Sequence, residues 1–265
     1  MMNSQLLVID PQNDFCDPEG SLFVPGADRD MSRLGAMIRR LGSKLGSIHV
    51  TLDTHHFVDV AHPVFWVNSQ GEHPAPFTII TADEVASGRW LAATPAHQAW
   101  ALEYTEKLEA NERYALCIWP PHCIIGSWGT QVYSPIYRAL LDWEIANIRS
   151  IDYLTKGTNY LTEHYSALQA DVPIPDDPGT QLNNGLIENL RNADTLVIAG
   201  EALSHCVRFT TQDLIENFAR EDIQKIVIIE DAMSPVPGFE KEGREFLDFV
   251  AGKGVRIITA EQLVL

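Results

Sequence analysis

Cys206 stands where a strand is expected to end and a helix to begin. Residues 195–199 are a short apolar run typical of a buried parallel strand, Gly200 breaks the run, and helical spacing begins at Ser204. The first turn of a helix has unpaired N–H groups and a partial positive charge, which favour a thiolate and can hold an oxyanion. Cys206 is therefore a candidate nucleophile. The alternative is a small buried hydrophobic residue without chemistry.

Four further side chains with useful chemistry come at or just past the ends of other apolar runs: Asp10, Asp53, His122 and Lys156. In a parallel sheet the carboxyl ends of the strands meet at one edge, and binding sites form beyond that edge. A single acid at a strand end is usually a turn former, whereas several aligned strand ends favour a shared site. The pattern predicts one polar site at the C-terminal edge of a sheet.

Apolar runs of strand length alternate with segments of helical spacing along the chain. The expected strands are residues 6–9, 48–52, 114–119, 150–154, 195–199, 226–229 and 255–258. The expected helices are residues 30–45, 95–111, 136–148, 179–192, a helix from Ser204 onward, and 240–251. This alternation predicts an α/β fold with a parallel sheet, right-handed crossovers and helices on both faces. Neither a repeat nor a linker interrupts it, so we expect a single domain over residues 1–265.

The composition excludes several classes of partner. The chain has 265 residues and a formal net charge of -17 at pH 7, which argues against binding to nucleic acid or to an anionic membrane. Its apolar runs are too short to cross a bilayer, and its first residues show no targeting pattern. The cysteines Cys16, Cys117, Cys123 and Cys206 form no CxxC pair and are too few for a disulfide framework. We expect a reducing, cytoplasmic setting.

Five segments together resemble the isochorismatase-like cysteine hydrolases, and within that family the nicotinamidases. The segments are VIDPQNDFCDPEGSLFVPGA (8–27), TLDTHH with a later AHP (51–63), WPPHCIIGSWG (119–129), TKG with a following HYSAL (155–168) and GEALSHCV (200–207). They occur in the family's order and span most of the chain. The resemblance implies a three-layer sandwich around a six-stranded parallel sheet.

The resemblance also implies a catalytic triad of Asp10, Lys156 and Cys206. A thiolate would attack an amide carbon and release ammonia through a thioester, with Asp10 moving the proton and Lys156 stabilising the anions. The expected oxyanion hole is formed by the N–H groups of Cys206 and Leu203, beside a cis peptide aligned with Ala202–Leu203. The alternative for Lys156 is a solvated surface lysine.

The family's metal ligands match Asp53, His55 and His122, with His62 as a less certain fourth. In an extended Asp-x-His segment both side chains point to one face, and a mixed carboxylate and imidazole set suits a divalent metal. Zinc is the first expectation, with iron and manganese as alternatives. In the family the ion holds the pyridine nitrogen, or waters near it. These histidines could instead cap a polar loop. His56 and Asp59 are expected to be bystanders, although either could replace His62.

Phe15 and Trp119 match aromatic positions that flank the substrate ring in relatives, although core packing would explain a Phe and a Trp equally well, and Tyr165 is a further candidate wall residue. A further segment, about residues 68–116, is longer than in compact nicotinamidases and includes Trp90, Trp100 and other large apolar residues. Such residues predict a packed excursion from the main fold. The excursion either covers the pocket or makes a subunit contact, and we expect a homo-oligomer.

The sequence predicts a metal-assisted cysteine amidohydrolase that converts nicotinamide, or a similar small amide, to the acid and ammonia. One alternative is a metal-independent carbamoyl or ureido amidohydrolase of the same family, which Asp53, His55 and His122 disfavour. A second is a non-catalytic binding protein on the same fold, which the intact triad disfavours. Vinyl ether hydrolysis by a true isochorismatase is disfavoured by Cys206, because those enzymes lack the nucleophilic cysteine.

Overall fold

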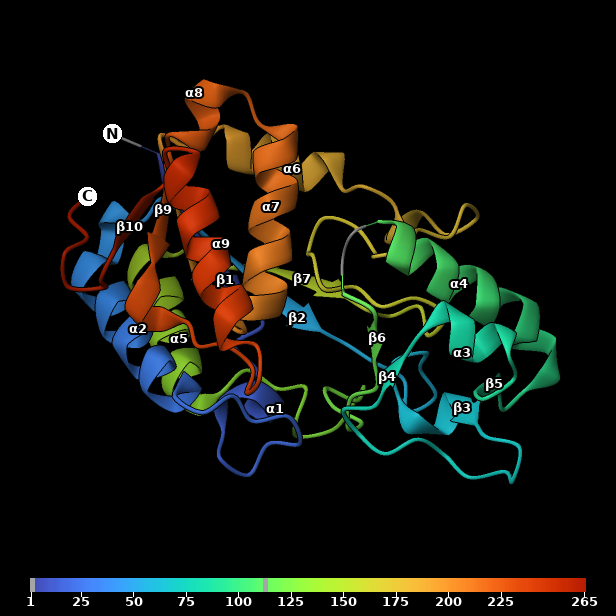
Figure 1. Cartoon of the computed structure of the whole chain (residues 1–265). Helices are drawn as coiled ribbons and strands as arrows, with labels where there is room; N and C mark the ends of the chain where they lie inside the picture. The colour runs from blue at the N-terminus through green and yellow to red at the C-terminus, as the bar shows by residue number, and fades with distance from the viewer. Residues whose placement is uncertain (1–2, 112–113) are drawn as a thin grey trace.

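The computed structural model describes residues 3–111 and 114–265. Within these ranges six strands form one parallel sheet in the order β10-β9-β8-β1-β2-β7 (Figure 1). The strands are β1 (Ser4–Ile9), β2 (Ser47–Asp53), β7 (Asp152–Lys156), β8 (Thr195–Gly200), β9 (Ile226–Ile229) and β10 (Arg256–Ile258). The expected α/β fold with a six-stranded parallel sheet is confirmed.

The central strands are apolar because both faces of the sheet are covered. Every residue of β1 and β9 is buried, which explains the unbroken apolar runs at residues 6–9 and 226–229. Gly200 ends β8 against the backbone of Ile9, with a φ of 123°. A Cβ at this position would lie 2.1 Å from the Ile9 carbonyl oxygen, so only glycine allows the two strands to approach here.

The helices lie in two layers. Right-handed crossovers from β1 through β2 to β7 place α2 (Ala27–Leu41) and α5 (Ser134–Asn147) on one face, where they pack together. The chain then returns across the sheet, so the helices of its C-terminal half lie on the other face (Figure 1). They are α6 (Asn184–Arg191), α7 (Arg208–Asn217), α8 (Arg220–Ile223) and α9 (Glu240–Gly252).

The strand register brings distant charged residues together at the C-terminal edge of the sheet. Ile9 pairs with Gly200, so Asp10 and the turn after β8 leave the sheet side by side. Asp53 pairs with Lys156 at the ends of β2 and β7. The short helix α1 (Asn13–Cys16) follows β1 at the same edge. This register is the structural reason for a shared polar site.

Two expectations about individual elements are wrong. Residues 114–119 do not form a strand of the main sheet: β6 (Leu116–Cys117) pairs antiparallel with β4 (Ile79–Ile80) in a separate two-stranded sheet. The segment after Ser204 is not the start of an ordinary helix, because Leu203–Val207 form a π-helical turn and α7 begins only at Arg208. The other expected helices are present with shifted ends, such as α6 in place of residues 179–192.

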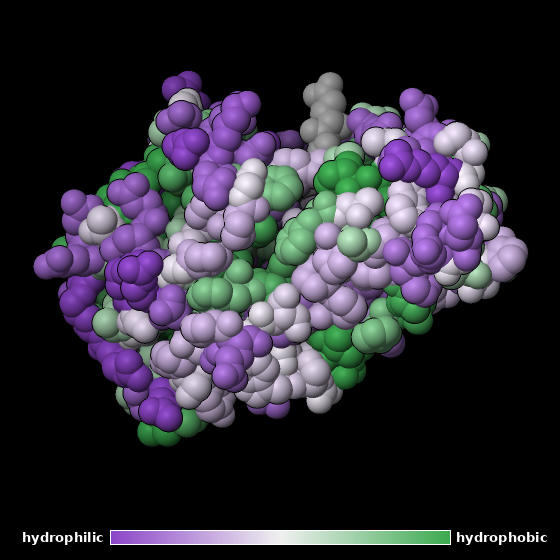
Figure 2. Space-filling model, turned by 60° about the horizontal axis from the view of Figure 1, so that its bottom comes forward, coloured by the Kyte–Doolittle hydropathy of each residue, from purple (hydrophilic) through white to green (hydrophobic). Residues whose placement is uncertain are grey.

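Within the segment between β2 and α5, residues 66–117 form a side lobe beside the sheet (Figure 1). It contains α3 (Ala82–Ala86), α4 (Gln98–Ala110) and a small antiparallel pair, β3 (Trp66–Val67) with β5 (Leu91–Ala92). The expected excursion over residues 68–116 is therefore packed, although residues 112 and 113 lie outside the described residues. Figure 2 shows apolar side chains gathered around a hollow in the middle of the molecule's lower face.

Among the described residues, no helix is long and apolar enough to cross a membrane. All four cysteines are buried and free.

Candidate active site

The turn that carries the nucleophile differs from the expectation by one residue. The cis peptide bond is Glu201–Ala202, not Ala202–Leu203. The N–H of Leu203 donates to the carbonyl oxygen of Ser234 at 2.9 Å, so the expectation that it serves an oxyanion is wrong. The N–H of Ala202 makes no hydrogen bond within residues 3–111 and 114–265, and Ala202 lines the same pocket as Cys206. Ala202 replaces Leu203 as the candidate donor beside the Cys206 N–H.

The sulfur of Cys206 is buried. Only 6% of the residue is exposed. Burial raises the pKa of Cys206 well above its ordinary value; Lys156 opposes this shift, and Asp10 adds to it. The sequence predicts that a helix start favours the thiolate, but burial beside a carboxylate outweighs that effect. The cysteine therefore needs a base next to it.

Asp10 and Lys156 are next to Cys206, as the resemblance implies. The Lys156 Nζ lies 2.9 Å from the Asp10 Oδ2 and donates to the Cys206 Sγ at 3.7 Å. Burial lowers the pKa of Lys156, but attraction by Asp10, Asp53 and Cys206 outweighs it and raises the pKa well above its usual value. The ammonium is fully buried among these groups, which contradicts the solvated-lysine alternative.

Asp10 is held rigidly at the end of β1. It is 0% exposed and has a φ of 41°, and its second carboxylate oxygen accepts a hydrogen bond from the Thr51 hydroxyl at 2.5 Å. Burial raises the pKa of Asp10, while the neighbouring Lys156 opposes the shift. A carboxylate with a raised pKa is a better proton acceptor than one in water. The position suits a general base for the Cys206 thiol.

Asp53 connects the triad to the candidate metal ligands. One of its oxygens accepts from the Lys156 Nζ at 3.0 Å, and the other lies 3.0 Å from the Nε2 of His55 and 3.4 Å from that of His122. Burial raises the pKa of Asp53, but His55 and Lys156 more than offset this and hold it well below its usual value. Gln12 fixes the Asp53 backbone through hydrogen bonds of 2.7 Å to its N–H and its C=O.

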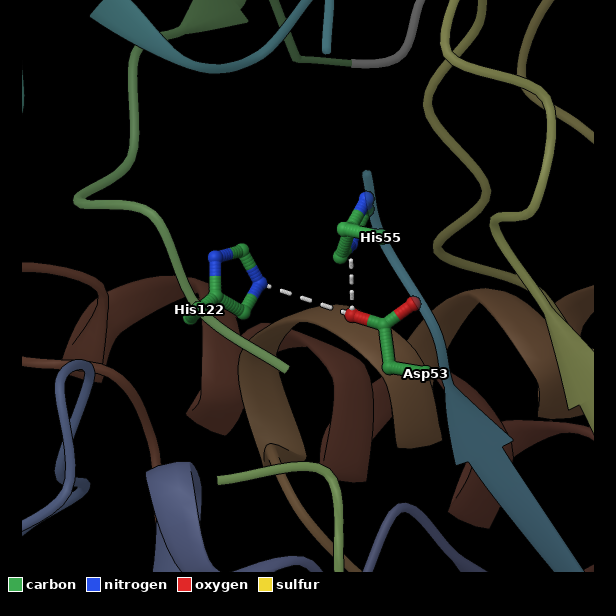
Figure 3. Close-up of side chains that lie close together, drawn as sticks. All are labelled: Asp53, His55 and His122. Atoms are coloured by element: carbon green, nitrogen blue, oxygen red, sulfur yellow. Dashed lines mark hydrogen bonds and ion pairs between the residues drawn. The ribbon is translucent and has the colours of Figure 1, made fainter. Parts of the chain in front are cut away.

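The donor atoms of Asp53, His55 and His122 all lie within 4.8 Å of one another, and the three residues are buried (Figure 3). The Nε2 of each imidazole faces the cluster, and a contact at Nδ1 orients the ring. The Nδ1 of His55 lies 3.1 Å from the Asp59 carboxylate, and that of His122 lies 3.0 Å from the Pro120 carbonyl oxygen. When each Nδ1 donates to its acceptor, the Nε2 lone pair points at the cluster, which is the arrangement that metal-binding histidines adopt.

His62 has the same arrangement as the other two histidines. Its ring centroid lies 5.3 Å from that of His55 and 5.4 Å from that of His122, and its Nδ1 lies 3.3 Å from the Phe57 carbonyl oxygen. Its buried Nε2 has no hydrogen-bond partner in the described part of the chain. Burial lowers the pKa of His62 to about 3, so this nitrogen keeps its lone pair. These residues therefore fit a divalent metal, with His62 available as a fourth ligand.

The two residues expected to be bystanders differ. His56 is exposed and stays a bystander. Asp59 is buried, and its carboxylate both holds His55 and accepts the N–H of Ala61 at 3.0 Å, so the expectation for Asp59 is wrong. The attraction of Asp53 and Asp59 outweighs burial and raises the pKa of His55 strongly. Asp59 is thus a supporting residue of the cluster.

A pocket opens between the triad and the histidines. Its lining is mainly apolar and aromatic, and it comprises Phe15, Leu22, Asp53, Trp119, His122, Glu163, Tyr165, Ala202, His205, Cys206 and Val236. All three aromatic residues expected at the substrate lie in this lining. Trp119 and Tyr165 are joined by a hydrogen bond of 3.0 Å from the indole N–H to the phenol oxygen. The structure thus places nucleophile, candidate metal ligands and aromatic walls around one cavity.

Two polar residues of the pocket carry no signal in the sequence. Glu163 is buried with its Oε1 3.9 Å from the His55 Nε2, and burial raises its pKa to about 8. His205 is buried among aromatic rings, including that of Phe239 at 4.6 Å, and burial lowers its pKa to about 3. A Cys–His dyad is not formed: the Nδ1 of His205 lies 2.9 Å from the Ser204 hydroxyl. Glu163 reaches the pocket only through the fold, whereas His205 directly precedes Cys206 in the chain.

Known proteins resemble this chain over most of its length. No family model matches it. The nicotinamidase of Saccharomyces cerevisiae is 25% identical over 205 residues, which cover 77% of this chain and 78% of that protein. The nicotinamidase/pyrazinamidase of Mycobacterium tuberculosis is 27% identical over 212 residues, which cover 80% and 78% of the two chains. A solved Acinetobacter baumanii nicotinamidase aligns with a TM-score of 0.67 at 22% identity and covers 100% of this chain and 99% of its own.

The chain is thus similar over most of its length to proteins named as nicotinamidases, and it shares the fold of the solved nicotinamidase. The chain has the expected six-stranded parallel sheet, with Asp10, Lys156 and Cys206 together at the edge where the motif matches place them. A further structural neighbour is a pyrazinamidase of Pyrococcus horikoshii in complex with zinc, with a TM-score of 0.57 at 18% identity over 97% of this chain and 99% of that one.

Proposed function

We propose that this protein is a metal-assisted amidohydrolase that converts nicotinamide to nicotinate and ammonia. One observation carries the proposal: the buried Lys156 Nζ lies 2.9 Å from Asp10 and 3.7 Å from the Cys206 sulfur, and Cys206 lines a small aromatic pocket that Asp53 and His122 also line. The curated relatives named as nicotinamidases support the choice of substrate.

Acylation begins with the thiol of Cys206. Asp10 accepts the thiol proton while the sulfur attacks the amide carbon, so that an S–C bond forms and the carbonyl electron pair moves to oxygen. The N–H groups of Ala202 and Cys206 are the donors for this oxyanion. Asp10 then gives its proton to the amide nitrogen, the C–N bond breaks, and ammonia leaves a thioester behind.

In the hydrolysis of the thioester, Asp10 takes a proton from water and the Cys206 sulfur regains the proton that it lost in acylation. Asp10 accepts a proton from water as the water oxygen attacks the thioester carbon, and the collapse of the second oxyanion breaks the C–S bond. The proton returns to the Cys206 sulfur and the carboxylate product leaves. Lys156 stays charged throughout, because its two carboxylate neighbours stabilise the ammonium, and it stabilises the anionic sulfur and Asp10 in turn.

The metal would be held by Asp53, His55 and His122, with His62 as a fourth ligand. A divalent ion bound there supplies a positive centre that accepts a lone pair from a ring nitrogen or a water. Zinc is the first choice, because a tetrahedral set of imidazoles and one carboxylate suits it, and iron and manganese remain candidates. Phe15, Trp119 and Tyr165 would confine a flat aromatic ring between this anchor and the Cys206 sulfur.

The test is ammonia release from nicotinamide by the purified protein, before chelation, after chelation and after addition of zinc, iron or manganese. Turnover that falls on chelation and returns with metal is expected. Cys206→Ala, purified in the same way, measures the background release of ammonia that does not depend on the nucleophile. Release that is unchanged by chelation would contradict the metal part of the proposal and indicate that the triad hydrolyses the amide without a metal. No release from nicotinamide, with Cys206 still alkylated by iodoacetamide, would contradict the substrate.

A further inference from the structure

Two acidic side chains are buried together behind the turn that carries Ala202. Glu201 follows Gly200 at the end of β8 and is 0% exposed, and Asp30 lies in α2 and is 2% exposed. Each carboxyl group accepts a hydrogen bond from Ser234, and the buried Glu201 Oε1 has no hydrogen-bond partner in the part of the chain that the structure describes. Neither takes part in the proposed reaction, yet Glu201 supplies the carbonyl side of the cis peptide bond to Ala202.

Ser234 joins this pair to the turn through three hydrogen bonds. Its N–H donates to the Glu201 Oε2 at 3.0 Å, and its hydroxyl donates to the Asp30 Oδ2 at 2.5 Å. Its carbonyl oxygen accepts the N–H of Leu203 at 2.9 Å. The side chain of Glu201 therefore fixes Ser234, and Ser234 fixes the residue after Ala202.

Few charges face the two acids. From α2 itself, Arg33 pairs with Asp30 and is also within reach of Asp231, which follows β9. From α1, the buried thiol of Cys16 faces Glu201 and carries no positive charge. The partly exposed Arg33 is thus the positive charge shared by the carboxyl groups of Asp30, Asp231 and Glu201. Burial raises the pKa of Glu201 well above its ordinary value, and the nearby Asp30 adds to the shift. Burial also raises the pKa of Asp30, but its hydrogen bonds and Arg33 oppose this.

We infer that Glu201 is a positioning residue that works as a neutral acid: its proton is shared with Asp30, and the pair holds Ser234 and the turn so that the Ala202 N–H faces the pocket. When the proton is lost, two adjacent buried carboxylates repel each other and Ser234 can no longer serve both. The turn then loses the support that aims the Ala202 N–H. This inference rests on the proposed reaction. It predicts that kcat falls at alkaline pH because Glu201, which is not a member of the triad, loses its proton.

The test compares wild type, Glu201→Gln and Glu201→Ala in kcat and KM for nicotinamide between about pH 6 and about pH 10. The amide of Glu201→Gln accepts from Ser234, donates to Asp30 and cannot ionise. The ratio of its kcat to that of wild type should be near one at low pH and should then rise by up to about tenfold per pH unit. Glu201→Ala should lose kcat at every pH with KM little changed. Glu188→Gln, an exposed change on α6, is the matched control and should follow wild type.

A second readout does not depend on turnover. Because the folded state binds the Glu201 proton more tightly than the unfolded state, this residue's contribution to stability is greatest below about pH 4.5 and falls as the pH rises toward the folded pKa. Melting temperatures measured across the same range should therefore fall less steeply for Glu201→Gln than for wild type.

The outcomes separate this inference from the proposed function. A kcat ratio that stays constant with pH, in an enzyme that hydrolyses nicotinamide, overturns the role of Glu201 and leaves the function standing. Absence of turnover in wild type refutes the substrate, and the melting curves then decide the inference: parallel curves for wild type and Glu201→Gln overturn it, and diverging curves support it.

Discussion

The C-terminal edge of the sheet and the side lobe of residues 66–117 support the same pocket by different means. At the sheet edge, Asp10, Asp53 and Lys156 are placed by strand register and are held by short contacts between charges. The side lobe contributes aromatic packing and hydrogen bonds to backbone, such as that from the Trp100 indole to the Leu161 carbonyl oxygen at 2.7 Å. The first region supplies the reactive groups, and the second packs against residues that line the pocket.

The side lobe reaches the pocket through the loop after β7. The Tyr104 hydroxyl accepts the N–H of Glu163 at 3.2 Å, and Tyr104 is fully buried. On the other side, the ring of Phe77 meets the indole of Trp119 edge-on at 5.9 Å. Changes in the two regions should therefore have different kinetic signatures: loss of kcat at the sheet edge, and shifts in KM or stability in the side lobe.

The largest effect is expected from Cys206→Ala. Loss of the nucleophile should lower kcat by a factor on the order of 10⁴ or more, because no other group in the pocket can form the thioester. The circular dichroism spectrum and the melting temperature should stay close to those of wild type, since the change removes one buried sulfur. Residual turnover within tenfold of wild type would show that the sheet edge does not supply the nucleophile.

A smaller effect is expected from Asp59→Asn. The change weakens the hold on the His55 Nδ1, and loss of such a supporting contact typically costs about 10- to 100-fold in metal affinity. Metal content after dialysis against a competing chelator measures this directly, and activity should recover at high metal concentration. His56→Ala, an exposed change in the same loop, is the control. Equal metal retention by both variants would contradict the role of Asp59.

The side lobe should affect binding more than chemistry. Phe77→Ala removes one edge-to-face contact with Trp119, and such pairs contribute about 0.5–1.5 kcal/mol. We expect KM for nicotinamide to rise by roughly two- to tenfold with kcat unchanged. Steady-state kinetics decide this prediction, and a fall in kcat without a change in KM would mean that the lobe also positions reacting groups.

The smallest kinetic effect is expected from Tyr104→Phe. The variant leaves the buried N–H of Glu163 without its acceptor, which costs about 1–3 kcal/mol of stability. Chemical denaturation should show this loss, while kcat stays within about threefold of wild type. A large loss of kcat at unchanged stability would contradict the division between the two regions.

The sheet edge was predictable from sequence because its signals are local. Asp10 and Lys156 each come at the end of a predicted strand, so the parallel order of the strands is enough to bring them together. The sequence places the cis bond one residue too late and predicts the wrong role for the Leu203 N–H. The acceptor of that N–H is Ser234, more than thirty residues later in the chain. No local pattern encodes such a contact.

The side lobe was predictable only as a packed segment. Its strands are two residues long, which is too short for any alternation of apolar and polar residues to show. The apolar run at residues 114–119 therefore looked like a strand of the main sheet, although it pairs with Ile79–Ile80 instead. Glu163 was missed for a related reason: it enters the pocket on a loop that Tyr104 supports from outside the local sequence.

Asp53 has a consequence for how this scaffold can change over evolution or by design. One oxygen of its carboxylate balances Lys156 and the other faces the histidines, so a single side chain serves two subsystems. A variant that discards the metal by replacing Asp53 also removes a counterion from the triad lysine. The route to a metal-free descendant therefore runs through replacement of the histidines first, with the aspartate retained as the lysine's partner.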